Sequence, residues 1–445
     1  MGEKLRVCIL TEFFYPDDTG GTGPVVSDLA RRLFDDHGVK IEVITSRHSY
    51  RAASPKFESS QTWDGIEIHR VPSPNLNSKN TALRTLGNLV FVFNVLIRLL
   101  FSKRYDAVLT TTAPPFLPVA ADINRMLRRT PYVYVVYDLE PDRIVGLKLM
   151  KPTSPFVAGM KWLQRRWLRR ASKVAAIGRC MAHHIERSYD LPKELTAVVP
   201  VGSRDIPSLA TSESEFRRRH GLSGFVVMYA GNFGRYHDFD TVLKAASSLQ
   251  AGQSEITFVM VGRGAQRKAV AERVAKEQLH NVRLFDFVPT EEFPDMLAAA
   301  DVCLVTMESG LEGTCVPSKL YSIMAAARPT VALVAEGSEV ALSLNEHRCG
   351  FRVVQQNSDA LAAALLELKT NYAARLEMGE RARTAFEDAF TTDKTAQAFH
   401  RLLEKATQRS RKAAVYPRVI SAVTIKKAAE EVRGKTDKEE VAVLN

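Results

Sequence analysis

Short apolar runs rich in β-branched residues alternate with helix-like stretches along most of the chain, and this alternation limits the possible folds more than any other feature. In the first half the runs lie at residues 5–10, 41–45, 107–111, 132–137, 173–177 and 197–201. In the second half they lie at residues 225–230, 256–261, 282–285, 302–306, 330–334 and 351–354. Strands that alternate with helices form a parallel sheet covered on both faces. Because single cores stop growing near about 250–300 residues, the 445-residue chain is predicted to form two doubly wound α/β domains.

The predicted boundary between the domains lies near residues 200–214, a segment rich in Pro, Ser, Thr and Asp. We predict a first Rossmann-like domain over residues 1–203, a second over 204–395, and a C-terminal helix with a charged tail over 396–445. An apolar strand begins within the first few residues, which leaves no room for a signal peptide. The five cysteines form no C-x-x-C pair, so they are expected to be reduced. These features favour a cytoplasmic location.

Three strand-to-helix junctions carry glycine at the position where a doubly wound sheet binds its ligand. The first holds Gly20 and Gly21, and Pro24 follows them at a suitable helix start. The other two place Gly231 and Gly262 directly after predicted strands. Glycine lets the backbone approach a phosphate closely, and free N–H groups at a helix start attract anions. The alternative is an ordinary flexible turn at each junction.

Arginine accompanies glycine in two of these loops, at Arg235 and Arg263. Its planar guanidinium fits phosphate oxygens. Neither loop contains the complete G-x-G-x-x-G pattern of a dinucleotide site, and neither ends in the Lys-Ser/Thr of a P-loop. The pattern therefore disfavours a nicotinamide enzyme and a P-loop NTPase, and favours another phosphate-containing ligand.

A fourth segment, residues 310–321, is the most informative. Its turn leads into a predicted helix with Lys319 in the first turn, where a positive charge opposes the helix dipole. A diphosphate bound between Lys319 and the helix N–H groups would resolve this conflict. The alternative is an ion pair between Lys319 and a nearby carboxylate such as Glu312.

Four stretches together resemble family-4 retaining glycosyltransferases of bacterial capsule, exopolysaccharide and O-antigen biosynthesis. They are Phe-Tyr-Pro with Gly-Gly at 14–21, Tyr-Asp-Leu-Glu-Pro-Asp at 137–142, Ala-Gly-Asn-Phe-Gly-Arg at 230–235, and Gly-Leu-Glu-Gly with Val-Pro-Ser-Lys-Leu-Tyr at 310–321. The resemblance covers residues 5–405. It implies a GT-B fold, in which two Rossmann-like domains face each other across a cleft. The nucleotide-sugar donor would lie mainly in the second domain and the acceptor mainly in the first.

The resemblance also implies roles for individual residues. Gly231, Asn232 and Arg235 would line the diphosphate, and Gly262, Arg263 and Phe287 would border the base. Glu312 and Gly313 would contact the sugar. Ser318 and Lys319, after Val316 and Pro317, would hold phosphate, while Gly20 and Gly21 would close over it from the first domain.

The chain departs from the family pattern at three positions. Ser322 stands where the family has a second glutamate that binds the ribose hydroxyls, and Glu339 is the candidate to replace it. Asp240 stands where a lysine is usual, so Lys319 is expected to supply the missing charge. Tyr137, beside Asp138, stands in place of a histidine. These departures leave a non-catalytic nucleotide-sugar-binding protein as an alternative.

The implied reaction needs fixed positive charge, since negative charge grows on the diphosphate as the bond to the sugar breaks. Arg235 and Lys319 would stabilise this charge. Asp138 would accept the proton of the acceptor hydroxyl or orient it, unless it is a buried residue that caps the next turn. The sequence has no Asp-x-Asp at a strand end and no His/Asp cluster with ligand spacing, so neither a metal nor another cofactor is expected. A UDP-linked sugar is the favoured donor.

Two segments and a net charge of +11 bear on the acceptor. Residues 88–101 are apolar but shorter than the roughly 20 residues that cross a bilayer, and residues 161–170 place five cations beside two tryptophans. Such segments suit helices on an acidic membrane, or else a buried helix and a solvated helix face. The interfacial interpretation predicts peripheral contact with the inner face of the plasma membrane and a lipid-linked acceptor. A soluble transferase with a small-metabolite acceptor is the alternative. An RNA-binding protein is disfavoured because no known nucleic-acid motif occurs.

Overall fold

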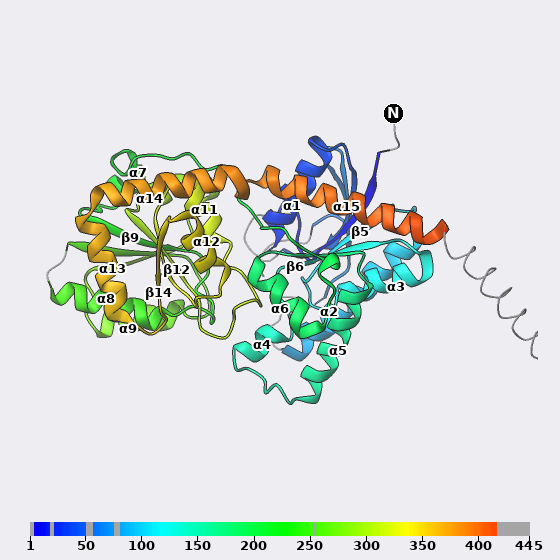
Figure 1. Cartoon of the computed structure of the whole chain (residues 1–445), viewed down its shortest axis with the longest axis horizontal. Helices are drawn as coiled ribbons and strands as arrows, with labels where there is room; N and C mark the ends of the chain where they lie inside the picture. Colours follow the sequence, from blue (N-terminus) through cyan, green and yellow to red (C-terminus); the bar gives the residue numbers. More distant parts are fainter. Residues whose placement is uncertain (1–3, 18–21, 50–56, 75–80, 253–254, 416–445) are drawn as a thin grey trace, which may run out of the picture.

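The computed structural model describes residues 4–17, 22–49, 57–74, 81–252 and 255–415. Two parallel sheets, each with helices on both faces, form two domains that lie side by side (Figure 1). The first sheet has the strand order β3-β4-β2-β1-β5-β6-β7-β8, and the second has the order β11-β10-β9-β12-β13-β14. The predicted pair of doubly wound domains is confirmed.

The first domain is built from elements that follow the predicted alternation. Its strands are β1 (Arg6–Leu10), β2 (Lys40–Ser46), β3 (Ser60–Trp63), β4 (Ile66–Val71), β5 (Ala107–Thr111), β6 (Tyr132–Val136), β7 (Lys173–Ala176) and β8 (Thr196–Val198). Its helices are α1 (Gly23–Asp35), α2 (Thr81–Phe101), α3 (Pro118–Arg128), α4 (Asp142–Gly146), α5 (Pro155–Arg170) and α6 (Arg179–Tyr189). Only β3 pairs with its neighbour in the antiparallel sense, at the sheet edge.

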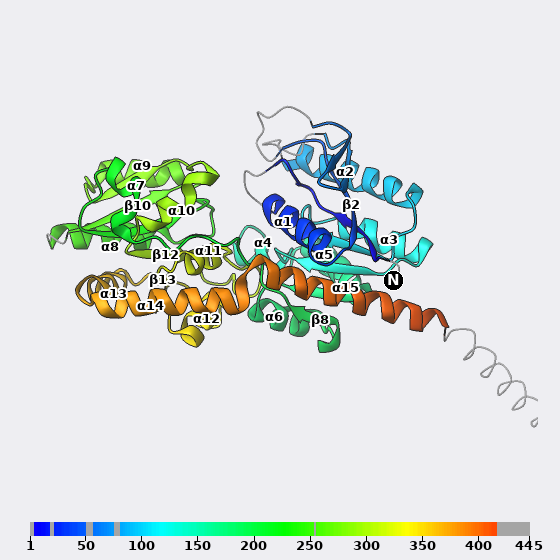
Figure 2. The same cartoon turned by 90° about the horizontal axis from the view of Figure 1, so that it is seen from above.

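The second domain repeats the architecture with fewer strands. Its strands are β9 (Phe225–Ala230), β10 (Ile256–Val261), β11 (Val282–Phe285), β12 (Val302–Thr306), β13 (Thr330–Leu333) and β14 (Gly350–Val353). Its helices are α7 (Glu215–Arg219), α8 (Phe239–Ala251), α9 (Arg267–Lys276), α10 (Phe293–Ala298), α11 (Lys319–Ala325), α12 (Glu339–His347), α13 (Ser358–Thr370) and α14 (Tyr372–Ala385). All its strand pairs are parallel, so the loops that follow the strands emerge at one edge, toward the first domain (Figure 2).

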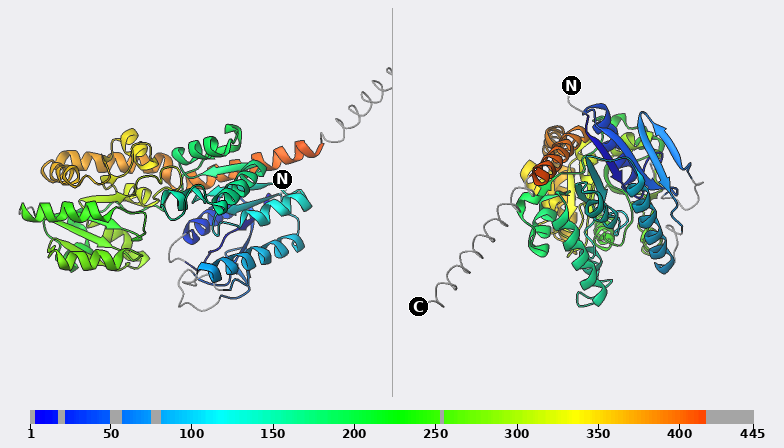
Figure 3. Two further views of the ribbon diagram at one scale, coloured as in Figure 1. Left: turned by 90° about the horizontal axis from the view of Figure 1, so that it is seen from below. Right: turned by 90° about the vertical axis from the view of Figure 1, so that its right-hand side faces the viewer.

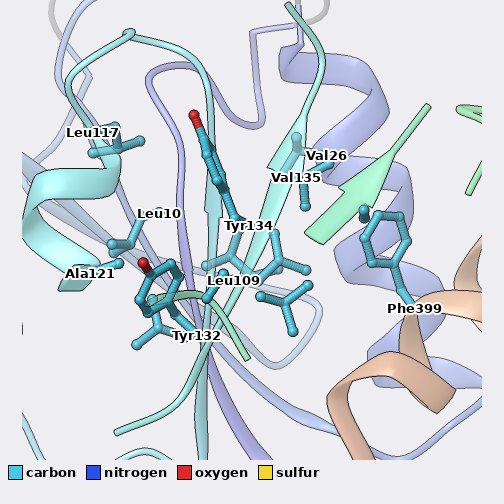
Figure 4. Close-up of a cluster of buried hydrophobic side chains, with 14 of the residues drawn as sticks. Leu10, Val26, Leu109, Leu117, Ala121, Tyr132, Tyr134, Val135 and Phe399 are labelled. Carbon is cyan, nitrogen blue, oxygen red and sulfur yellow. The ribbon is translucent and has the colours of Figure 1, made fainter. Parts of the chain in front are cut away.

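The last helix, α15 (Thr392–Val415), crosses back from the second domain and lies along the first, as Figures 1 and 3 show. Its Phe399, Leu402 and Leu403 are buried in the core of the first domain. Figure 4 shows Phe399 beside that core, which includes Leu109 and Tyr134 of the central strands. The predicted C-terminal segment therefore contains a helix that is part of the first domain's packing. Residues 416–445 lie outside the described part of the chain.

The five cysteines are free, and Cys8, Cys303 and Cys349 are buried. Burial raises the pKa of the Cys303 thiol to about 12, so this side chain packs as a small apolar group.

Candidate active site

The loops after β9 and β10 pack directly on each other at the sheet edge that faces the first domain. Gly231, Gly262 and Gly264 have φ angles of +145°, +141° and +148°, a region that side-chain-bearing residues rarely adopt. A Cβ atom on Gly262 would overlap the Gly231 carbonyl oxygen, and one on Gly264 would overlap the Asn232 side chain. Gly231 and Gly262, which were predicted to contact the donor, thus allow two backbones to meet, together with Gly264. We call these two loops, together with Lys319, the donor edge.

Lys319 is the first residue of α11, and its ammonium group lies under the Gly231 loop. A Cβ atom added to Gly231 would lie 3.0 Å from Nζ, and Nζ lies 3.8 Å from the centroid of the Tyr229 ring. Nζ is buried and donates no hydrogen bond to any of the described residues. Burial lowers the pKa of Lys319 to about 7. A buried cation without a counterion is unstable, so an anion at this position would stabilise the charged form of Lys319.

The alternative partner for Lys319 is excluded by the structure. Glu312 turns its carboxylate to the backbone N–H of Gly310, with an N–O distance of 2.9 Å. The turn is held by Gly313, whose φ angle is +76° and whose added Cβ would lie 2.7 Å from the Cβ of His184 in the first domain. The predicted sugar-contacting turn is therefore clamped between the two domains.

His237 and Tyr229 complete the surroundings of Lys319, and neither was predicted from the sequence as a site residue. The Nδ1 atom of His237 lies 2.5 Å from the Thr306 carbonyl oxygen. Because a carbonyl only accepts, Nδ1 carries the proton and Nε2 is left as an acceptor. Burial and the neighbouring Lys319 lower the pKa of His237 well below its usual value, so the ring stays neutral. Only the fold brings these two side chains to Lys319.

The other predicted cations lie on the outside of the donor edge. Arg235 is exposed, and the structure gives it neither an ion pair nor a hydrogen bond to any described residue. Arg263 pairs with Asp286 at 3.1 Å, and both side chains are more than 60% exposed. Phe287 is exposed beside them. Arg235 is thus free to reach a ligand, and Phe287 offers an open apolar surface next to the loop after β10.

The first domain contributes Asp138 to the opposite wall of the site. Asp138 follows β6 and forms an isolated antiparallel bridge with Cys315, and the adjacent Leu139 N–H donates to the Thr314 carbonyl at 2.8 Å. The Asp138 side chain is 48% exposed and lies 3.8 Å from the Arg143 guanidinium. It is therefore not a buried cap. The nearby Tyr236 phenol has a raised pKa, chiefly from burial and also from the Asp138 charge.

Glu339 is placed differently from its predicted role. Its carboxylate is buried, accepts the backbone N–H of Arg179, and forms an ion pair with the Arg179 guanidinium at 3.0 Å. This pair joins α12 of the second domain to α6 of the first. Ser322, at the position of the family's second glutamate, lies 3.1 Å from Ser203 through the two hydroxyl oxygens. Glu339 is thus committed to holding the domains together, and the proposal that it binds ribose has no support from this geometry.

The remaining predicted residues cluster around Lys319 or lie beyond the described residues. Val316 is buried, and Pro317 and Ser318 lead into α11. Ser318 stands at the N-cap without a side-chain capping bond. Gly20 and Gly21 lie outside the described residues. The helix α1 begins at Gly23, one residue before Pro24.

Within the described residues, one group of side chains has the spacing of a metal site: Glu42, Glu67 and His69. These residues lie on β2 and β4, away from the donor edge. Glu42 already forms a salt bridge with Arg6 at 3.1 Å. Glu42 also lies 3.3 Å from His69, so contacts within the protein account for the closeness of these side chains.

Comparison with known proteins matches both halves of the chain. Residues 20–202 match the family described as Glycosyl transferase 4-like domain, and residues 212–385 match the family described as Glycosyl transferases group 1. The chain is 27% identical over 305 residues to "Probable glycosyltransferase WbjE" from Pseudomonas aeruginosa, which covers 66% of this chain and 74% of the relative. It is 26% identical over 401 residues to "O-antigen chain mannosyltransferase C" from Escherichia coli, with coverage of 89% and 97%.

The fold is shared with solved structures. A crystal structure of Anabaena Alr3699/HepE in complex with UDP-glucose superposes with a TM-score of 0.67 at 17% identity and covers 90% of this chain and 99% of that chain. The two facing Rossmann-like domains are those of the GT-B fold, and the two family matches identify the chain as a glycosyltransferase. The chain belongs to the family-4 type of these enzymes, with relatives in the biosynthesis of surface polysaccharides.

Proposed function

We propose that this enzyme transfers a sugar, with retention of the anomeric configuration, from a UDP-linked donor to a lipid-linked or saccharide acceptor. The observation that carries the proposal is the buried Lys319 ammonium, which has no partner among the described residues and lies between the Gly231 loop and Tyr229. A diphosphate placed there would satisfy the charge. The complex of Alr3699/HepE with UDP-glucose, on the same fold, supports a uridine donor.

Bond cleavage would be driven by charges that are in place before the reaction. As the bond between the anomeric carbon and the diphosphate oxygen breaks, the electron pair stays on the diphosphate. Lys319 would face that growing charge from inside the loop, and the exposed Arg235 would face it from outside. Such preorganised groups stabilise a transition state without the cost of reorganising solvent. No metal and no other cofactor is part of this proposal.

The acceptor would be bound on the wall formed by the first domain. Its hydroxyl oxygen forms the new bond to the anomeric carbon, and its proton passes to the half-exposed carboxylate of Asp138. Arg143, 3.8 Å away, would orient that carboxylate. Because Asp138 is linked to Cys315 by the interdomain bridge, closure of the domains would set the distance between acceptor and donor.

The acceptor class and the location are part of the proposal. The names of the relatives, an O-antigen chain mannosyltransferase among them, favour a growing surface saccharide carried on a lipid. We place the enzyme in the cytoplasm, in peripheral contact with the inner face of the plasma membrane, where such acceptors are found. The same chemistry would serve a soluble acceptor.

A binding screen tests the donor. UDP, GDP and ADP, with their glucose or mannose derivatives, are each added to the protein at one common concentration. A ligand that binds only the folded state raises the free energy of unfolding by about 2.7 kcal/mol when it is present at about 100 times its dissociation constant, and by less when it binds more weakly. We expect the uridine series to raise the melting temperature most. Arg235→Ala, which removes an exposed cation that has no ion pair with any described residue, should reduce this shift and lower turnover by about 10²–10³-fold. Equal shifts and equal turnover in the wild type and Arg235→Ala would contradict the proposal. Binding without turnover would support the non-catalytic alternative.

A further inference from the structure

The two segments for which the sequence predicts membrane contact, residues 88–101 and 161–170, are packed differently in the structure. In α5, all five cations of residues 161–170 form ion pairs. Lys161 pairs with Asp142, Arg165 and Arg169 pair with Asp190, and Arg166 and Arg170 pair with Asp122. Trp167 is buried, and of the two tryptophans only Trp162 is exposed. The prediction that α5 presents a free basic and aromatic face is therefore not supported by the packing.

Helix α2 instead carries two apolar faces. Its inner face packs on β2, β4 and α3, where Phe91, Val92, Val95 and Leu99 are buried. Its outer face, which we call the α2 face, is formed by side chains that are each at least 40% exposed: Leu83, Leu86, Leu89, Phe93, Ile97 and Phe101. At about 100° per residue these six positions fall within an arc of about 120°. They form a continuous stripe along the helix.

An apolar patch continues the stripe at the C-terminal end of α2. Phe101 is 83% exposed, and the neighbouring end of α3 adds the exposed Met126 and Leu127. Arg128 fastens the two helix ends, since its guanidinium donates to the carbonyls of Leu99 and Ser102 at 2.9 and 2.8 Å. The apolar stripe is thus continued by an apolar patch that is fixed to it.

A cavity of about 270 Å³ lies at the same end of the molecule, where α2 and α3 lead into β5 and β6, and Arg104 and Arg129 belong to its lining. Both arginines are exposed, as is Lys103. An apolar surface beside exposed cations is the arrangement that binds at the boundary between acyl chains and anionic headgroups.

The direction of α2 relates this surface to the active site. β4 ends at the sheet edge that faces the second domain, and α2 returns the chain to the start of β5 at the opposite edge. The helix has 21 residues, which is about 30 Å at 1.5 Å per residue. Its first turns, with Leu83 and Leu86, therefore lie at the edge where the acceptor would bind. A membrane that binds α2 would therefore also lie close to the part of the first domain where the acceptor would bind.

We propose that the α2 face docks on an anionic bilayer and lies in the plane of its interface. Among the described residues, Leu83–Phe101 is the helix whose length and composition would suffice to cross a membrane. Crossing would expose the inner face and break the core around Phe91 and Leu99, so the helix lies on the membrane and does not span it. This inference rests on the proposed function for its purpose, which is to bring a lipid-linked acceptor to the site, but the surface can be tested without the reaction.

Vesicle sedimentation tests the surface with the full chain. Vesicles of phosphatidylcholine with 30 mol% phosphatidylglycerol are compared with vesicles of phosphatidylcholine alone. We expect the wild type to sediment with the anionic vesicles. A variant with Phe93→Ser and Ile97→Ser should lose at least tenfold in partitioning. Arg104→Gln with Arg129→Gln should lose about fivefold for each cation removed, with a smaller dependence on salt. The matched control is Leu366→Ser, an exposed leucine on α13 of the second domain.

The outcomes separate this proposal from the donor proposal. Loss of vesicle binding in the α2 variants, with an unchanged thermal shift by UDP, supports docking through the α2 face. Equal vesicle binding by the wild type and the Phe93/Ile97 variant overturns it, and so does a wild type that binds neither vesicle. A wild-type dimer that the same variant converts to a monomer would also overturn it, because the α2 face would then be an interface between two copies. None of these results depends on whether the donor binds.

Discussion

The donor edge and helix α5 both contain several cationic side chains, but those of α5 are paired with aspartates and two of those at the donor edge are not paired with any described residue. In α5 five cations share three aspartates, and Asp122 alone, which is almost fully buried, accepts two arginines. At the donor edge Lys319 is buried without a partner among the described residues, and Arg235 is exposed and equally unpaired in the described part of the chain. Unbalanced charge, and not the density of charge, distinguishes the proposed donor site from α5.

The difference has a thermodynamic meaning. A paired cation at a surface contributes little to stability in either direction, whereas a buried cation without a counterion reduces it. The buried charge of Lys319 is therefore expected to lower the free energy of unfolding of the empty protein. A bound diphosphate would offset this loss. Substitutions in the two regions should therefore have different effects: those at the donor edge should change the affinity for the ligand, and those in α5 should change the free energy of unfolding.

The largest effect is expected from Lys319→Met, which keeps the length of the side chain and removes its charge. Turnover should fall by about 10²–10³-fold, since one preorganised charge is lost. The empty protein should become more stable, by about 1–3 kcal/mol, because a buried polar group without a partner is removed. Thermal unfolding and initial rates are measured on the same preparation. A variant that loses both activity and stability would show that Lys319 is a structural residue.

A second effect is the pH dependence of donor binding. Burial lowers the pKa of Lys319 to about 7 in the empty site, and a diphosphate beside the ammonium would raise it again. Binding then takes up a proton above pH 7. The dissociation constant should be flat below pH 7 and should increase about tenfold per pH unit above it, up to the pKa of the complex.

Calorimetry with a UDP-sugar between pH 6 and pH 9 measures this dependence, and two buffers with different ionisation enthalpies count the protons. A nucleotide diphosphate sugar is the suitable ligand, since its phosphate diesters do not titrate in this range. His237 stays neutral throughout, because its pKa is lowered well below the usual value. Lys319→Met is the control and should bind weakly with no such slope. A wild-type slope of zero would mean that Lys319 is already charged when the site is empty.

Much of the fold was predictable from the sequence, because strands buried on both faces read as continuous apolar runs. Each of the twelve predicted runs overlaps a strand of the structure. β3 and β4 were missed. In β4 the buried Ile66 and Ile68 alternate with Glu67 and His69, and β3 is a polar edge strand of four residues. Strands at the edge of a sheet carry too little apolar signal to be recognised one by one.

The site was predictable only where its geometry is local. Glycine directly after a strand, and lysine at the start of a helix, follow from neighbours in the sequence. Glu339 was assigned to ribose, but its partner Arg179 is 160 positions away, and no spacing rule indicates that contact. The same limit applies to α5. Its cations resemble a membrane surface in the sequence, and only the folded chain brings Asp122 and Asp190 to them.

The smallest effects are expected in α5, where one of the paired aspartates is buried and another is exposed. Asp122→Asn leaves Arg166 and Arg170 facing a neutral group in a partly buried position, and the free energy of unfolding should fall by about 1–3 kcal/mol. Asp190→Asn is the matched substitution at a site where the aspartate is 79% exposed, and it should cost less than about 1 kcal/mol. Denaturant titration measures both.

Neither substitution should change the dissociation constant for the donor, because these charges are balanced within the first domain. Lys319→Met must show the reverse pattern in the same assays, with weaker donor binding and a gain in stability. If Asp190→Asn or Asp122→Asn weakens donor binding as much as Lys319→Met does, the overall positive field of the protein holds the diphosphate. Local imbalance at the donor edge would then not be the feature that selects the site.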